Sequence, residues 1–300
     1  MNLAASVRER LLKKARAEGR PFQELLQYYA MERFLYRLAQ SPHAGMFVLK
    51  GALLLTAWRA PLSRPTMDID FAGKTSNDLA HIRLLIGDIC DQEVEDDGLH
   101  FVKSSIRAIR IKENANYEGV RARFHTLLAG ARIPLQIDVG FGDVIVPAVA
   151  SVNYPALLEF PNPVLIAYPK ETVIAEKVEA LTTLGMLNSR MKDYFDIWLL
   201  SQLYEFDGAV LFDSIKTTFE HRNTRIETHP ASLSVAFASD PAKEKQWQAF
   251  VKRSRFASAP ADLKDAIAKV SAFVGPLLSA AASGTAMSAI WKPSGGWQQQ

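Results

Sequence analysis

Two aspartates separated by one residue, Asp68 and Asp70, are well suited to hold a metal ion. They lie in the segment MDIDFAG (67–73), whose alternation of apolar and acidic residues predicts a strand. On a strand both side chains project from one face, about 6.5–7 Å apart along the chain. Two neighbouring carboxylates repel each other unless a cation neutralises them, and Mg²⁺ prefers oxygen ligands. The alternative is a solvent-facing sheet edge, because this tripeptide is common.

Two further positions favour a site for metal and phosphate. A predicted strand ends in Gly51 and a helix begins at once, so a phosphate could approach backbone N–H groups at the helix N-terminus. The alternative at Gly51 is a tight turn that needs no ligand. Asp138 lies among apolar neighbours in LQIDVGF, where an acid is costly to bury unless it binds a metal or another cation.

The elements that must position these residues follow from the hydrophobic pattern. Residues 4–41 read as helices with one buried face, and residues 221–260 as irregular and polar. The predicted strands are 46–51, 67–73, 99–111, 120–130 and 132–143. The predicted helices after residue 45 are 52–60, 76–90 (capped by Ser76 or Asn77) and 262–283, and residues 169–206 are helical in pattern.

This pattern predicts an α/β (α+β) chain with four segments. They are an N-terminal helical segment (1–45), a core with a mixed sheet (46–165), a helical C-terminal domain (166–290) and a disordered tail (291–300).

The helical C-terminal half contains a second cluster of charged residues. Lys177 lies in a helix whose apolar residues form a core stripe. Asp193 and Asp196 are three residues apart and share a helix face, and Lys192 is four residues before Asp196. The spacing alone favours ordinary ion pairing on a helix surface.

Composition and charge exclude several classes of protein. The single cysteine, Cys90, allows no internal disulfide, and the six histidines have no metal-ligand spacing. The longest uncharged run (276–290) is too short and too rich in small residues for a membrane span, and the N-terminus has no apolar segment typical of a signal peptide. The net charge of +3 hides two basic stretches, 8–24 and 103–132, which suit a polyanionic partner.

Five motifs in order resemble a known family. They are LKGALLL, RPTMDIDF, LQIDV, AEKVEAL and RMKDYFDI, and together they cover about residues 45–200. Their arrangement resembles the DNA polymerase β-like nucleotidyltransferase superfamily, and more specifically the AbiEii/AbiGii nucleotidyltransferase toxins of type IV toxin–antitoxin and abortive-infection systems. The resemblance implies a polymerase β-like nucleotidyltransferase core.

The resemblance also implies roles for individual residues. Asp68, Asp70 and Asp138 would bind Mg²⁺ or Mn²⁺, and Asp138 could instead act as the base toward the acceptor hydroxyl. The implied catalytic residues are Asp68, Asp70, Asp138, Lys177 and Asp193. The implied nucleotide-binding residues are Gly51, Ala52, Arg64, Thr66, Lys177 and Arg190. The family typically has Gly-Gly or Gly-Ser at the turn, whereas Gly51 is followed here by Ala52, which offers no hydroxyl to a phosphate.

The implied function is transfer of a nucleoside monophosphate from an NTP to RNA, with the 3′ end of tRNA as the leading acceptor, arresting translation and growth. The triphosphate would lie in a cleft between core and helices. A cognate antitoxin of the winged-helix regulator type would neutralise the toxin in the cytoplasm, without a membrane partner. Two alternatives stay open: a nucleotidyltransferase for a small molecule such as an antibiotic, and a non-catalytic member that binds nucleotide or a partner.

Overall fold

The computed structural model describes residues 2–58, 65–114, 117–254 and 259–299, and it divides the chain into two compact units. Unit 1 contains Met1–Asp143 and Ala150–Ala167, and unit 2 contains Val144–Val149 and Tyr168–Gln300. The helices of residues 1–45 therefore belong to the same unit as the large sheet. The domain limits drawn from the sequence remain a prediction.

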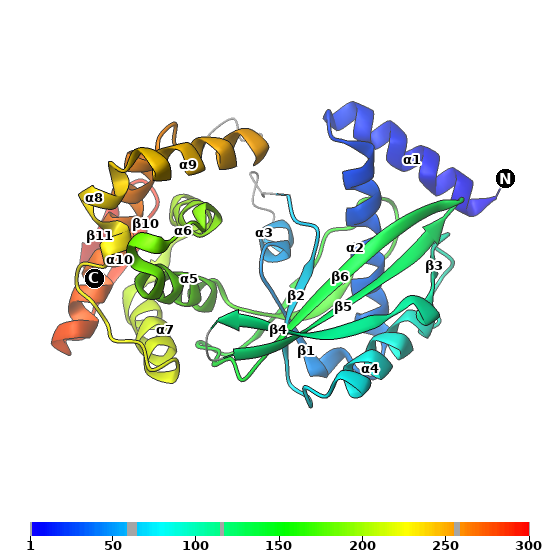
Figure 1. The fold of residues 1–300 in the computed structure, drawn as a ribbon, viewed down its shortest axis with the longest axis horizontal. Coiled ribbons are helices and arrows are strands. Elements are labelled where there is room, and N and C mark those ends of the chain that lie inside the picture. Colours follow the sequence, from blue (N-terminus) through cyan, green and yellow to red (C-terminus); the bar gives the residue numbers. More distant parts are fainter. Residues whose placement is uncertain (1, 59–64, 115–116, 255–258, 300) are drawn as a thin grey trace. The chain divides into compact units, whose positions relative to one another are not determined.

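Unit 1 is built on a mixed sheet whose strand order is β3-β5-β6-β2-β1-β8-β7, with β4 paired to β5 (Figure 1). Its strands are β1 (Phe47–Lys50), β2 (Ile69–Gly73), β3 (His100–Phe101), β4 (Arg107–Asn114), β5 (Tyr117–Leu128), β6 (Ala131–Phe141), β7 (Ala150–Asn153) and β8 (Val164–Ala167). The β2–β6 and β1–β8 pairs are parallel, and the other pairs are antiparallel. The predicted mixed α/β fold class is thus confirmed.

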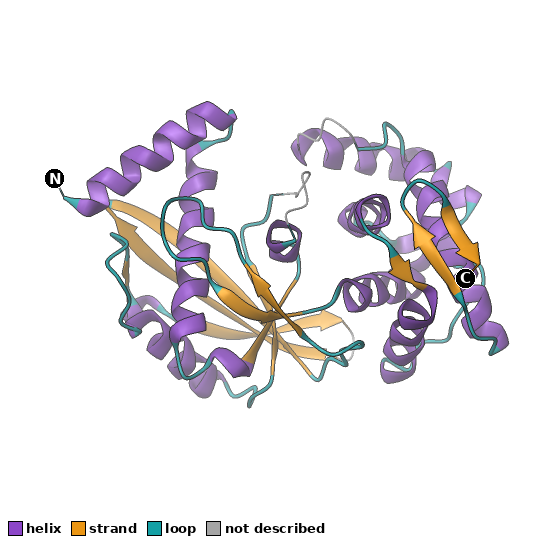
Figure 2. Ribbon diagram, turned by 180° about the vertical axis from the view of Figure 1, so that it is seen from behind, coloured by secondary structure: helices purple, strands orange, loops and turns teal. Residues whose placement is uncertain are grey.

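Helices cover one face of this sheet. They are α1 (Leu3–Glu18), α2 (Phe22–Gln40), α3 (Leu53–Ala57) and α4 (Leu79–Asp91), and Figure 2 shows α2 lying across the strands. Alternate residues of β5, including Phe124, are buried toward α2, where Phe34 and Phe124 have ring centroids 5.6 Å apart. The side chain of Asp78, rather than Ser76 or Asn77, caps α4 by accepting a hydrogen bond from the His81 N–H.

A buried ion pair fastens α2 to the acidic stretch that follows α4. The Arg37 guanidinium donates to both oxygens of Asp97, at 2.6 and 3.1 Å, and Asp97 is 1% exposed. The two parallel N–H···O bonds fix the geometry as well as the charge balance. Farther along, the stretch 99–111 is not one strand as predicted, because a 3₁₀ turn (Lys103–Ser105) separates β3 from β4.

Unit 2 is a helical assembly around α10 (Leu263–Ser283). Its other helices are α5 (Lys170–Leu184), α6 (Met191–Leu203), α7 (Gly208–His221), α8 (Val235–Ala238) and α9 (Pro241–Ser254). The segment predicted to be irregular, 221–260, therefore contains α8 and α9. By length and composition α10 alone among the described helices could cross a membrane, yet Pro276 lies inside it and its apolar face packs on α6 and α7.

A small antiparallel sheet includes the last described residues of the chain. Its strands are β9 (Phe206–Asp207), β10 (Ala289–Lys292) and β11 (Gly296–Gln299), in the order β11-β10-β9. Trp291 and Trp297 both pack against Phe273 of α10, with ring centroids 4.7 and 5.9 Å away. The tail that the sequence predicts to be disordered is therefore ordered through residue 299, because its two indoles pack on the unit.

Candidate active site

One row of residues crosses four strands of unit 1 and contains two of the predicted acids. Lys50 of β1 is opposite Asp70 of β2, Asp70 is opposite Asp138 of β6, and Asp138 is opposite Arg121 of β5. Residues in register on neighbouring strands present their side chains on the same face. The sheet therefore brings together acids that are 68 residues apart in sequence.

The third acid, Asp68, completes a cluster at this point of the sheet. One carboxylate oxygen from each of Asp68, Asp70 and Asp138 lies within 4.8 Å of the others. Asp138 is 6% exposed, whereas Asp68 and Asp70 are only partly buried. Oxygen atoms of ionised carboxylates are the ligands that Mg²⁺ prefers. The donor set is thus suited to a hard divalent cation.

The turn at Gly51 fits closely against this cluster. Gly51 has φ of 74°, a conformation that favours glycine, and a Cβ at this position would overlap the Asp70 carboxylate. Ala52 follows at the N-terminus of the five-residue helix α3 and is 3% exposed. The turn is therefore a close approach of the backbone to a predicted metal ligand, and no larger residue fits there.

A second set of predicted residues comes together in unit 2. The ammonium Nζ of Lys177 on α5 lies 2.7 Å from Asp193 Oδ1 and 2.8 Å from Asp196 Oδ2, both on α6. The Nε of Arg190 lies 2.6 Å from Asp193 Oδ2. Burial raises the pKa of Asp193, but the charges of Lys177 and Arg190 outweigh it and lower the pKa to about 2. Asp193 is fully buried and ionised here.

The comparison with protein families decides what kind of protein carries these two clusters. The family described as the nucleotidyl transferase AbiEii toxin of type IV toxin–antitoxin systems matches residues 33–269, which is most of the chain. The chain belongs to this family. The predicted resemblance is confirmed, and the protein is a nucleotidyltransferase of the AbiEii toxin family.

Two solved structures from Helicobacter pylori are similar to this AbiEii-family chain. A protein assigned as a nucleotidyltransferase has 16% sequence identity and a TM-score of 0.45, over 87% of this chain and 96% of that chain. The protein JHP933 has 16% identity and a TM-score of 0.47, over 87% of this chain and 93% of that chain. The search of curated proteins finds no match.

The sequence did not single out Arg121 as a site residue in this AbiEii-family protein. Its Nε and one terminal nitrogen donate to the two oxygens of Asp138, at 2.8 and 2.6 Å. This hydrogen bonding to Asp138 raises the pKa of Arg121, and the charges of Asp68 and Asp70 add to the effect. A carboxylate has about four acceptor positions, so the Arg121 pair leaves Asp138 able to bind a cation as well.

Two residues of α2 hold the segment that leads into Asp68. The backbone N–H of Thr66 donates to the Tyr28 hydroxyl at 3.0 Å, and the Gln27 amide donates to the Met67 carbonyl at 3.3 Å. The Thr66 hydroxyl in turn donates to Asp68 Oδ1 at 2.5 Å. Thr66 therefore lies beside the carboxylate cluster, and its role in nucleotide binding stays a prediction, while Tyr28 and Gln27 were not predicted. Arg64 lies outside the described residues.

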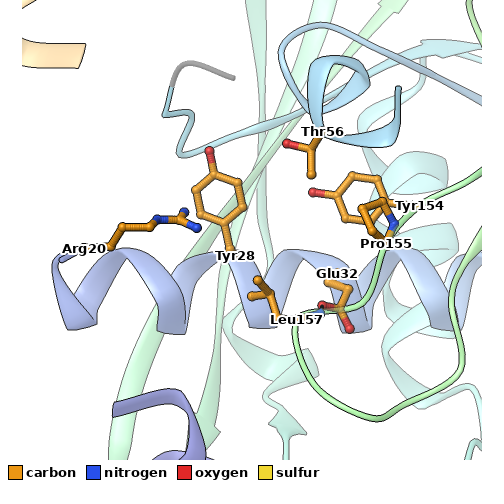
Figure 3. A pocket seen from close by; sticks show the side chains of 7 residues that line it. All are labelled: Arg20, Tyr28, Glu32, Thr56, Tyr154, Pro155 and Leu157. Carbon is orange, nitrogen blue, oxygen red and sulfur yellow. Dashed lines mark hydrogen bonds between the residues drawn. The ribbon is translucent and has the colours of Figure 1, made fainter. Parts of the chain in front are cut away.

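A small pocket lies beside Tyr28, between α2 and α3 (Figure 3). Its lining residues are Arg20, Tyr28, Glu32, Thr56, Tyr154, Pro155 and Leu157. Burial raises the pKa of Glu32 to about 7, against the lowering effect of the Arg33 charge. Glu32 Oε2 accepts the Leu157 N–H at 2.7 Å, so this acid joins α2 to the 154–157 segment.

Proposed function

We propose that this AbiEii-family chain is a metal-dependent toxin that transfers a nucleoside monophosphate from an NTP to the 3′ end of an RNA. The observation that carries the proposal is the convergence of Asp68, Asp70 and Asp138 beside the Gly51 turn. A triphosphate next to three carboxylates requires neutralisation, and a hard divalent cation supplies it. We propose Mg²⁺, with Mn²⁺ as the substitute.

In this proposal the three aspartates hold the metal at the sheet. When bound, the metal ion neutralises phosphate charge and activates the attacking oxygen. Asp68 keeps its orientation through the Thr66 hydroxyl, and Asp138 through Arg121. Two nitrogens of Arg121 donate hydrogen bonds to the two oxygens of Asp138. We therefore assign Asp138 to metal binding rather than to the alternative role of base.

We further propose that Gly51 and Ala52 present backbone N–H groups to the phosphates and that Lys177 and Arg190 contribute positive charge toward them. An ammonium group and a guanidinium group both suit phosphate oxygens. Asp193 would orient Lys177, consistent with their 2.7 Å contact in unit 2. Arg64 stays a candidate phosphate contact.

The nucleotidyl transfer needs no reactant besides the NTP and the acceptor. The acceptor 3′-hydroxyl oxygen forms a bond to the α-phosphorus as the bond from that phosphorus to the bridging oxygen breaks. Pyrophosphate leaves with the electron pair, and the hydroxyl proton passes to solvent. Asp68, Asp70 and Asp138 would hold the cation that neutralises the charge developing on the phosphate oxygens.

We propose tRNA as the acceptor, because nucleotide addition to tRNA 3′ ends would stop translation and growth. The reaction would take place in the cytoplasm, where NTPs and tRNA occur together. The family belongs to type IV toxin–antitoxin systems, so an antitoxin partner is expected. We propose that it is a winged-helix regulator encoded beside the toxin.

The test is incubation of the purified chain with Mg²⁺, each α-³²P-labelled NTP in turn and total tRNA. Label on RNA that disappears with EDTA supports the proposal. Label on an added small molecule such as an aminoglycoside, and not on RNA, would instead assign the chain to small-molecule modification. No transfer with either acceptor, while NTP still binds, would favour a non-catalytic member of the family.

A further inference from the structure

One face of strands β4, β5 and β6 is exposed and continues outward from the carboxylate cluster. Starting at Asp138, every second residue of β6 faces the same way, namely Gln136, Pro134 and Arg132. Arg123 of β5 is opposite Gln136, and Arg107 of β4 is opposite Arg123. Arg107, Arg123 and Arg132 therefore lie on the same face as the predicted metal ligands, and all three are exposed.

The distances along this face suit a polymer that leads into the site. Arg123 is one two-residue step, about 7 Å, from the level of Asp138, and Arg132 is three steps, roughly 20 Å. Arg107 is one strand spacing, about 4.8 Å, beyond Arg123. The arginines thus extend from the reaction centre over the length of several nucleotides.

The charge on this face is not balanced by acids. Among the described side chains of β4, β5 and β6 that project there, Asp138 is the sole carboxylate, and it is paired with Arg121. Arg123 donates to the neutral Gln136 amide oxygen at 2.9 Å, and Arg107 donates to the Ser104 and Ile106 carbonyls. Each of these contacts leaves the positive charge in place.

The other basic stretch of the chain has a different charge balance. On α1, Lys13 pairs with Glu9 and Lys14 pairs with Glu18, both at 3.0 Å. Arg20 pairs with Glu24 at 2.7 Å. Such exposed pairs add little stability, but they reduce the net charge that a polyanion would meet. Of the two stretches that the sequence indicated, the structure favours the sheet face over α1.

The same face also exposes apolar side chains between the arginines. Ile109 is opposite Arg121 and is 51% exposed, and Leu127 is 37% exposed. Unstacked bases of a single strand can lie against apolar or aromatic side chains, while the backbone meets the cations. The other face of these strands contacts α2 and α4 (Figure 2).

From this arrangement we propose that the exposed face of β4–β6 is the acceptor surface, along which the backbone of a single-stranded RNA 3′ end runs to the metal site. Arg107, Arg123 and Arg132 contact its phosphates, and this inference rests on the proposed function of RNA modification. Its occupant is RNA because the face combines unbalanced guanidinium groups with exposed apolar side chains.

The test uses the full chain and deacylated tRNA labelled with fluorescein at its 5′ end. Fluorescence anisotropy without NTP gives the Kd at several KCl concentrations for wild type and for the triple variant Arg107→Gln, Arg123→Gln, Arg132→Gln. Loss of three single-strand phosphate contacts should make the slope of log Kd against log salt shallower by about 2, and at about 0.15 M salt should weaken binding about 50-fold.

The matched control is the α1 triple variant Lys13→Gln, Lys14→Gln, Arg16→Gln. It also removes three positive charges, and it does so at exposed or half-exposed positions. We expect less than a threefold change in its Kd. Equal losses in the two triple variants would show attraction to net charge alone and would overturn the inference. An unchanged Kd in the sheet-face variant would overturn it as well.

Transfer assays separate this inference from the proposed function. If wild type labels tRNA and the sheet-face variant labels it with an unchanged KM for tRNA, the surface assignment is wrong and the function stands. If wild type neither binds nor labels RNA, both are wrong. Near-wild-type NTP binding in the sheet-face variant, together with a raised KM for tRNA, is the supporting result.

Discussion

The two acid clusters of this chain differ in how their charge is balanced. In unit 2, Asp193 and Asp196 share the Lys177 ammonium, and Arg190 adds a second cation beside the fully buried Asp193. In unit 1, three carboxylates gather within 4.8 Å, and Arg121 pairs with Asp138. In unit 2 two cations lie among two carboxylates, whereas in unit 1 three carboxylates converge at one point with Arg121 beside Asp138, an arrangement suited to a divalent cation.

This difference means that loss of an acid should act in opposite ways in the two clusters. Removing a carboxylate from unit 1 relieves repulsion between like charges in the metal-free protein. Removing Asp193 from unit 2 takes away the buried partner of Arg190 and one of the two carboxylates that Lys177 contacts, which destabilises the fold. Activity and stability should therefore separate in unit 1 and fall together in unit 2.

The largest expected effect is on activity in unit 1. Replacement Asp68→Asn keeps an acceptor for the Thr66 hydroxyl but removes a metal ligand, and we expect nucleotide transfer to fall roughly 1000-fold, about 4 kcal/mol. The melting temperature without metal should be unchanged or higher. Transfer of labelled nucleotide and thermal unfolding measure the two effects. Asp91→Asn at the exposed end of α4 is the control, and full activity in Asp68→Asn would refute the site.

The next effect is on stability in unit 2. Replacement Asp193→Ala should lower the free energy of unfolding by about 3–5 kcal/mol, because it breaks a buried ion pair. Urea unfolding followed by tryptophan fluorescence measures the change. Glu220→Ala, which removes an exposed partner of Lys216, should change it by less than about 0.5 kcal/mol. A stable Asp193→Ala variant with poor NTP use would show that this cluster serves the reaction without stabilising the fold.

A smaller effect on stability is expected when the pH is lowered. The pKa of Asp193 is lowered to about 2 in the folded chain, below that of the unfolded chain. Its ion pairs therefore stabilise the protein above about pH 4, and this stability, on the order of 2 kcal/mol, is lost as the pH falls from 4 to 2. Urea unfolding at pH 5, 4, 3 and 2 measures it. The variant Asp193→Asn should not show this loss of unfolding free energy between pH 4 and pH 2, and Asp68→Asn should still show it.

The smallest effect tests the support of the unit 1 cluster by α2. Replacement Tyr28→Phe removes the acceptor for the Thr66 N–H, a loss of about 1 kcal/mol. We expect kcat to fall about fivefold with little change in the KM for NTP, because Asp68 is positioned less well. Tyr36→Phe on the same helix is the control. An equal fall of kcat in both variants would mean a general loosening of α2.

Much of the fold could be predicted because the pattern of each element agrees with its environment. The period-two alternation of β2 and β6 and the helical stripe of α10 predict elements that the structure contains. Helix α9 was missed because it is highly charged, with Lys243 and Trp247 as its buried residues. The C-terminal hairpin was missed because its glycines and glutamines resemble a disordered tail, while its stability depends on contacts with Phe273.

The candidate site likewise contains residues that the sequence predicts and residues that it does not. The acids and Gly51 could be predicted because residue type and spacing along one strand already limit their chemistry. Arg121 could not, because its role depends on the register between β5 and β6, which a single sequence does not specify. Tyr28 could not either, since its contact with Thr66 spans 38 residues and its pattern is that of a core aromatic. The signal that could have found Arg121 is its alternation with Arg123, which places two arginines on one face of the predicted strand.

The indole packing of the C-terminal hairpin has a spectroscopic consequence. Of the five tryptophans, Trp198, Trp247, Trp291 and Trp297 lie in unit 2, and Trp58 lies in unit 1, one residue beyond α3. Trp247 is fully buried and Trp291 is 6% exposed, so the intrinsic emission at shorter wavelengths comes from unit 2. A red shift during denaturation therefore reports the melting of the helical half, while Trp58 alone is left as an optical reporter beside the glycine turn.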